Sequence, residues 1–161
     1  TISEKQAMKS IDLQTIFLFG GTLALASALD KSGAGKLIAD TVINNLGKSA
    51  SPFVLLVAVF MIAVVLTNFM SNTATTALLV PISVSIAANM GADPRAVLMA
   101  TVIGGSCAYA TPIGMPANTM VLSVGGYKFR DYVKAGLPLI VVATIVSLVL
   151  LPIFFPFFPA K

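Results

Sequence analysis

The chain has 161 residues, of which 57% are hydrophobic and only 10% are charged, and its mean hydropathy is +0.96. An ordinary soluble domain is about 25% charged, so this composition indicates a protein of the lipid bilayer. The net charge of +4 comes from ten basic residues scattered among short loops. Since no face or tail collects them, the charge argues against a nucleic-acid partner.

The first region, residues 1–48, predicts one membrane helix and one helix lying in the interface. No charged residue occurs between Leu13 and Leu29, and Asp30-Lys31-Ser32-Gly33 closes that run. From Lys36 to Leu46 the pattern is amphipathic, which suits a helix parallel to the membrane plane. Because Thr1 is not Met and no signal peptide follows, we expect the chain to begin inside a longer protein.

The second region, residues 49–92, is uncharged and much longer than the roughly 20 apolar residues that one crossing needs, so it must fold back. A polar turn from Thr67 to Thr76 separates two apolar arms, Phe53 to Leu66 and Ala77 to Asn89. The turn is either a surface connection between two spanning helices or the end of a re-entrant hairpin at membrane depth. In the second interpretation it is a binding site.

The third region, residues 93–126, predicts a broken transmembrane helix. Gly104-Gly105 is followed by the run Thr111 to Thr119, in which Pro112 and Pro116 lie four residues apart. Proline lacks the N–H of the helical hydrogen bond and clashes with the preceding turn, so no regular helix accommodates this run. A continuous, kinked helix is the alternative.

The last region, residues 127–161, combines an interfacial collar with a final crossing. Aromatic and basic side chains alternate from Tyr127 to Lys134, and Gly136 to Phe158 is apolar. The predicted fold class is therefore an all-α membrane protein, in which transmembrane helices accompany a re-entrant hairpin and a broken helix.

Enzymatic chemistry has no support in the sequence. There is no His, and Cys107 is the only cysteine, so we expect it to be a small buried residue without a disulfide partner in this chain. No nucleophile, base and orienting acid converge in the uncharged stretches, and no metal-ligand spacing occurs. The sequence predicts no enzyme and no organic cofactor.

Anion binding is the chemistry that the two irregular segments suggest. Asn72-Thr73 and Asn118-Thr119 each stand at the start of an apolar helical run. A helix N-terminus carries roughly half a positive charge, and two of them facing one cavity favour a bound carboxylate or sulfate. No Lys or Arg lies in these segments, so a dianion would need a co-bound cation. Neutral hydroxyl, amide and carbonyl oxygens suit sodium, and the lack of intramembrane Asp, Glu or His argues against proton coupling.

A family resemblance rests on these same residues. Thr67-Asn68-Phe69-Met70-Ser71-Asn72-Thr73 followed by Pro81, then Ser106-Cys107-Ala108 and Pro116-Ala117-Asn118, resembles the C-terminal half of the divalent anion/sodium symporter family, part of the ion transporter superfamily. The resemblance covers nearly the whole chain. It implies two inverted repeats, a homodimer, an elevator-like movement and a prokaryotic inner or plasma membrane, with this chain as one repeat half.

The resemblance also implies the site residues. The substrate-binding set is Ser71, Asn72, Thr73, Met115, Pro116 and Asn118, and the sodium ligands are Thr67, Met70, Asn72 and Gly114. The family often has Ala-Thr-Pro where Gly114-Met115-Pro116 stands here, so a hydroxyl is missing, and Thr111 is the alternative carrier of that role.

The function implied is sodium-coupled transport of small divalent anions such as C4-dicarboxylates. A sulfate or inorganic anion transporter of the same family is one alternative. A structural or channel-like membrane subunit, in which the polar turns are surface loops, is the other.

Overall fold

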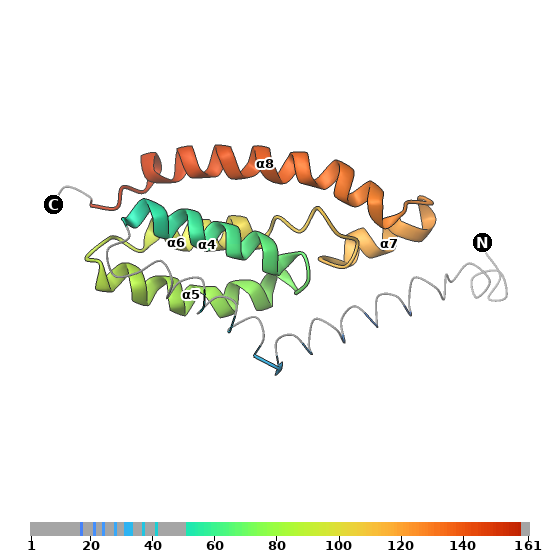
Figure 1. Ribbon diagram of the computed structural model, residues 1–161, viewed down its shortest axis with the longest axis horizontal. Coiled ribbons are helices and arrows are strands. Elements are labelled where there is room, and N and C mark those ends of the chain that lie inside the picture. Colours follow the sequence, from blue (N-terminus) through green and yellow to red (C-terminus); the bar gives the residue numbers. More distant parts are fainter. Residues whose placement is uncertain are drawn as a thin grey trace, which may run out of the picture.

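The computed structural model describes residues 51–158 continuously, together with isolated positions between 17 and 41. The predicted first membrane helix and interfacial helix fall outside the continuous part. Within residues 51–158 all regular structure is helical (Figure 1), as the predicted all-α class requires. The helices are α4 (Pro52–Thr67), α5 (Asn72–Asn89), α6 (Arg95–Gly105), α7 (Pro116–Val124) and α8 (Phe129–Phe154).

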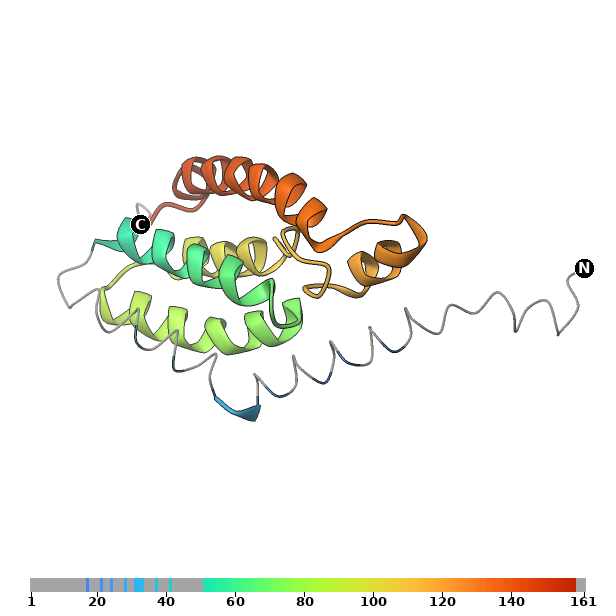
Figure 2. The same ribbon diagram turned by 45° about the vertical axis from the view of Figure 1, so that its right-hand side comes forward.

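Helices α4 and α6 form the centre of the packing, because they contact each other most extensively and each also contacts α5 and α8. Figures 1 and 2 show α4 and α5 side by side below α8, with α7 at the end where the chain leaves α6. Phe60 of α4 and Val97 of α6 belong to one buried cluster. Gly104 permits close approach of α6 to α4, since a Cβ there would lie 2.9 Å from the Phe60 carbonyl oxygen.

Polar side chains cap the helices at their starts. The Ser51 hydroxyl accepts a hydrogen bond from the Val54 N–H of α4 at 3.4 Å, and the Ser71 hydroxyl accepts one from Ala74 of α5 at 3.1 Å. Asp93 precedes α6 and pairs with the Arg95 guanidinium at 2.7 Å. The hydrogen bonds from Arg95 hold the pKa of the Asp93 carboxyl below its usual value, so this carboxylate is ionised at neutral pH.

Two irregular segments interrupt the helices, and their bounds differ from those predicted. The hairpin tip (residues 68–71) is shorter than the predicted turn from Thr67 to Thr76, because the Ser71 cap allows α5 to begin at Asn72. The break (residues 106–115) begins before the predicted run and ends where Pro116 starts α7, a position at which proline is favoured.

Helix α8 carries the strongest membrane signal in the described residues. It has 26 residues, its most apolar 18-residue window has a mean hydropathy of 2.7, and by length and composition it is the one helix in the described residues that could cross a bilayer. It begins at Phe129, so it takes in part of the predicted collar, and it ends at Phe154 rather than Phe158. Val142 and Ile145 are more than half exposed, so this helix presents apolar side chains outward.

Helix α8 also lies directly against the break. A Cβ on Gly136 would fall 2.2 Å from the Tyr109 carbonyl oxygen and 2.7 Å from the Ala110 nitrogen. No side chain fits between these backbones, so the glycine is required for α8 to reach the break.

Candidate functional site

Three oxygen atoms converge where α4 ends. The Thr67 hydroxyl is 2.8 Å from Oδ1 of Asn72 and also hydrogen-bonds the Gly105 carbonyl oxygen. A hydroxyl has one proton, so it can serve only one of these two acceptors at a time. Thr67 is fully buried. The group therefore offers a cluster of neutral oxygens, the ligand type that coordinates sodium in transporters.

Asn68 connects the hairpin tip to the break. Its amide nitrogen donates to the carbonyl oxygens of Val64 at 2.7 Å and Cys107 at 3.2 Å, and its Oδ1 accepts the Ala110 N–H at 3.0 Å. One side chain thus satisfies three backbone groups, two of which belong to the break. Unpaired backbone groups are costly away from water, so Asn68 stabilises the irregular chain there.

Thr111 makes a second connection between the same segments. Its hydroxyl donates to the Asn68 carbonyl oxygen at 2.6 Å and accepts the Gly114 N–H at 3.1 Å. Gly114 lies so close to the hairpin that a Cβ there would fall 2.9 Å from the Thr67 carbonyl oxygen. The break is therefore folded onto the hairpin tip at Gly114.

Asn118 and Thr119 turn their side chains back into the break. The Asn118 amide nitrogen donates to the backbone carbonyl oxygens of Ala108 at 2.8 Å and Thr111 at 3.0 Å. The Thr119 hydroxyl donates to the Pro112 carbonyl oxygen at 2.6 Å. Both hydrogens of the Asn118 amide are used in this way. The amide holds the start of α7 and has no hydrogen left to donate to a bound anion.

A cavity of about 420 Å³ opens beside the hairpin tip, and we call it the tip cavity. Asn72 and Thr73, which begin α5, lie on one side of it and Ser106 lies on the other. Its lining combines hydroxyl and amide groups with apolar surface and includes no charged side chain: Asn72, Thr73, Thr76, Ala77, Val102 and Ser106. A helix N-terminus beside neutral donors is an arrangement that favours an anion.

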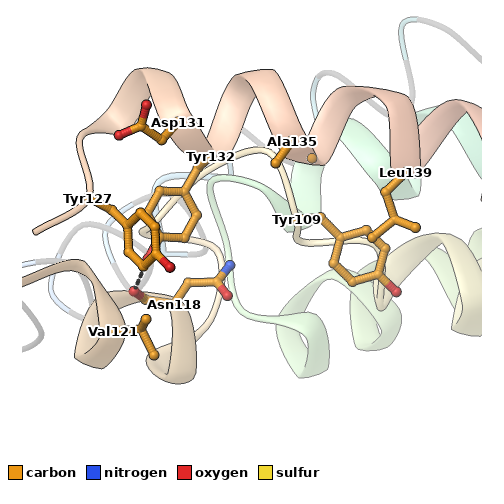
Figure 3. Close-up of a pocket in the computed structure, with 9 residues that line it drawn as sticks. Tyr109, Asn118, Val121, Tyr127, Asp131, Tyr132, Ala135 and Leu139 are labelled. Carbon is orange, nitrogen blue, oxygen red and sulfur yellow. Dashed lines mark hydrogen bonds between the residues drawn. The ribbon is translucent and has the colours of Figure 1, made fainter. Parts of the chain in front are cut away.

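A second cavity of about 420 Å³ lies between α7 and the start of α8 (Figure 3). Tyr132 donates its hydroxyl hydrogen to the Asn118 carbonyl oxygen at 2.7 Å, and its ring meets Tyr127 edge-on at 6.1 Å between centroids. Asp131, near the start of α8, also lines this cavity (Figure 3). The cavity is mostly apolar and is separate from the tip cavity in its lining.

The structure brings together part of the predicted site. Thr67 and Asn72 are in contact, Gly114 lies against Thr67, and Asn72 and Thr73 line the tip cavity. The Ser71 hydroxyl caps α5 instead of lining that cavity. Met70 is buried, Met115 is half-buried, Pro116 is exposed, and Asn118 lines the second cavity. Among the described residues no cluster of His, Cys, Asp or Glu could hold a metal ion.

The sequence did not reveal three of the contacts. Asn68 and Thr111 were not expected to tie the hairpin tip to the break, and the Gly105 carbonyl was not expected beside Thr67. The signal that was available is the break itself, because ten residues outside a regular helix need other partners for most of their backbone groups.

Comparison with known proteins places the chain in a family. A family model described as citrate transporter, CitMHS, matches residues 1–161. The chain belongs to this citrate transporter family. Its relatives include sodium-dependent dicarboxylate transporters, so the predicted membership among the divalent anion/sodium symporters is confirmed. The proteins of this family are transporters, which are integral membrane proteins and not enzymes.

The individual relatives agree with the family. The chain is 36% identical over 156 residues to the uncharacterized transporter YfbS of Escherichia coli, covering 97% of the chain and 25% of the relative. It is 26% identical over 157 residues to the sodium-dependent dicarboxylate transporter SdcS of Staphylococcus saprophyticus, covering 94% and 30%. It is 35% identical over 125 residues to solute carrier family 13 member 2 of Mus musculus, covering 75% and 20%. The chain thus spans less than a third of the length of these three relatives.

Proposed function

We propose that this chain is the C-terminal repeat half of a sodium-coupled secondary transporter for small divalent anions such as C4-dicarboxylates. The observation that carries the proposal is the oxygen cluster of Thr67, Asn72 and Gly105 beside a tip cavity whose lining residues are uncharged. Two relatives whose names specify sodium-dependent dicarboxylate transport support the choice of ion and substrate.

Sodium binds, in this proposal, at the oxygen cluster. Its ligands are the Thr67 hydroxyl, Oδ1 of Asn72, and the carbonyl oxygens of Met70 and Gly114. The contact between Gly114 and Thr67 supports a site shared by the hairpin tip and the break. A bound cation also removes the competition for the single Thr67 proton, because Oδ1 of Asn72 then faces the cation and the proton goes to the Gly105 carbonyl oxygen.

The anion binds in the tip cavity against the start of α5. Asn72 and Thr73 supply side-chain contacts there, and the helix N-terminus supplies partial positive charge. The Ser71 side chain shapes this N-terminus. Met115 and Pro116, at the start of α7, are the proposed substrate contacts from the break, although they do not line the tip cavity. Asn118 contributes by holding that helix start, since its amide hydrogens are engaged.

Helix lengths support a re-entrant hairpin in residues 49–92. Helix α4 has 16 residues, which corresponds to about 24 Å, and the hydrocarbon core is about 30 Å thick. The hairpin tip would then lie within the membrane, where Asn68 and Thr111 satisfy its backbone. The remaining regions follow as a scaffold side in residues 1–48, a broken helix in 93–126 and a collar with the last crossing in 127–161, within a homodimer of two-repeat subunits.

The test is uptake of labelled succinate by proteoliposomes that contain the full-length transporter, with and without a sodium gradient. Asn72→Ala should reduce sodium-dependent uptake at least tenfold, because it removes a contact shared by cation and anion. Thr144→Val is the matched control, since the Thr144 hydroxyl donates to Ile140 within α8. Citrate and sulfate are added as competitors.

Each result has a defined meaning. Sodium-dependent succinate uptake that is lost in Asn72→Ala supports the proposal. Uptake of labelled sulfate without uptake of labelled succinate would assign the inorganic anion alternative. A folded protein that takes up none of the three anions would contradict the symporter and favour a structural or channel-like subunit.

A further inference from the structure

A single hydroxyl group links the break to the hairpin tip at the point where the two segments are closest. The Thr111 hydroxyl donates to the Asn68 carbonyl oxygen and accepts the Gly114 N–H. These two hydrogen bonds are chemically consistent, because they use the one proton of the hydroxyl as donor and one lone pair as acceptor. Thr111 is 5% exposed, so water does not readily replace either bond.

The same link fixes the position of Gly114. A Cβ on Gly114 would lie 2.9 Å from the Thr67 carbonyl oxygen and 3.3 Å from the Asn68 Cα, so the Gly114 backbone packs closely against the hairpin tip. The bond from the Gly114 N–H to Thr111 opposes a shift away from it. The Gly114 peptide is therefore held from both sides, next to the residue whose hydroxyl anchors the oxygen cluster.

Direct contact with an anion is a different role, and the hydrogen bonds of Thr111 argue against it. An anion requires a donor, and the only proton of this hydroxyl is given to Asn68. Thr111 is also absent from the residues that line the tip cavity. Its place in the structure is between the two segments.

We propose that Thr111 is a positioning residue for the cation site, which holds the Gly114 peptide in register with Thr67 and Asn72 through its bonds to Asn68 and Gly114. The proposal rests on the sodium-coupled function proposed above. Groups that bind an ion must be held close to their productive geometry by supporting residues, and Thr111 supplies that support without contacting the ion.

The test measures the sodium concentration that gives half-maximal uptake in the full-length transporter. Thr111→Val keeps the shape of the side chain and removes both hydrogen bonds, and it should raise this concentration about tenfold. Thr111→Ser keeps the hydroxyl and should stay within twofold of the parent. Thr101→Val is the matched control, because Thr101 is also buried and its hydroxyl donates to Val97 and lies 3.4 Å from the Ser83 hydroxyl, neither of which belongs to the hairpin tip or the break. The half-maximal sodium concentration of Thr101→Val should also stay within twofold of the parent.

A second measurement does not depend on transport. Cys107 is buried, and its carbonyl accepts a hydrogen bond from Asn68, so its thiol reports separation of the break from the hairpin tip. Modification of Cys107 by N-ethylmaleimide, located by peptide mass spectrometry, should be at least fivefold faster in Thr111→Val and unchanged in Thr101→Val. If Thr111→Val does not accumulate in the membrane, Thr111→Ala removes the same bonds from a smaller side chain.

The outcomes separate this proposal from the function on which it rests. An unchanged sodium requirement and unchanged Cys107 modification in Thr111→Val would overturn the positioning role, and so would equal effects of Thr101→Val. A parent without sodium-dependent uptake would contradict the proposed function. In that case the Cys107 modification rates alone decide whether Thr111 holds the break against the hairpin tip.

Discussion

Two regions of the molecule provide hydrogen-bond partners for their backbone groups in opposite ways. One region is the hairpin tip with the break, and the other is helix α8. In the tip and the break the chain leaves helical geometry, and Asn68, Thr111 and Asn118 provide the hydrogen bonds that the backbone lacks. Helix α8 keeps helical geometry over 26 residues, its hydrogen bonding is interrupted only at Pro138 and Pro152, and its exposed side chains are mostly apolar. Tolerance to substitution should therefore be low in the first region and high along α8.

The largest effect is expected for Asn68→Ala. The substitution leaves the Cys107 carbonyl and the Ala110 N–H without their partner in a buried place. Each such group costs about 1 to 3 kcal/mol, so we expect a loss of about 3 kcal/mol in unfolding free energy. Denaturant unfolding of the purified transporter in detergent measures this loss of unfolding free energy, with Thr144→Val as the control. A loss below about 1 kcal/mol would show that the break does not depend on this amide.

Gly114→Ala should have the next largest effect. The added Cβ would meet the Thr67 carbonyl oxygen and the Ala108 Cβ, each at 2.9 Å. Overpacking of this kind costs about 1 to 3 kcal/mol, and here it pushes the break away from the hairpin tip. Both stability and sodium affinity should fall, which unfolding and sodium-dependent uptake measure separately. Normal sodium affinity in the variant would mean that the contact has no part in cation binding.

Thr75→Val should change the stability in the opposite direction or leave it unchanged. Thr75 is fully buried in α5, and its hydroxyl has no hydrogen-bond partner among the described residues. Valine has nearly the same shape and removes the unpaired group, so stability should be unchanged or rise by up to about 1 kcal/mol. Thermal unfolding, compared with Thr111→Val, gives the contrast between an unpaired and a paired buried hydroxyl. A marked loss of stability would reveal a ligand at Thr75.

The smallest effect is expected for Val142→Leu on α8. Val142 is 57% exposed and its backbone belongs to a regular helix, so the change should stay within about 0.5 kcal/mol. Unfolding and uptake of this variant, beside those of Gly114→Ala, test the contrast between the two regions directly. A large loss would show that α8 packs against a further surface in the full-length transporter.

Much of this organisation could be predicted from the sequence, because it depends on local chemistry. The two irregular segments follow from polar residues and prolines inside apolar runs, and the contact between Thr67 and Asn72 joins residues close in sequence. Helix bounds were less accurate, since the cap at Ser71 and the start at Pro116 each moved residues from the predicted loop into a helix.

The supporting contacts could not be predicted, because their partners are distant in the chain. Asn68 pairs with Ala110 and Thr111, and nothing in either stretch specifies the other. The direction of the Asn118 amide is a similar case. Its place at the start of an apolar run suggested an anion contact, whereas the structure turns it toward Ala108 and Thr111.

The absence of a side chain at Gly136 has a mechanical consequence. The backbone of α8 touches the break at Tyr109 and Ala110, so a movement of the break relative to α8 would have to separate this contact. If this contact is kept, a displacement of the break along the membrane normal also moves the apolar outer face of α8 relative to the surrounding acyl chains. The thickness and viscosity of the bilayer would then oppose this movement, because α8 and the break are joined by the backbone contact at Gly136.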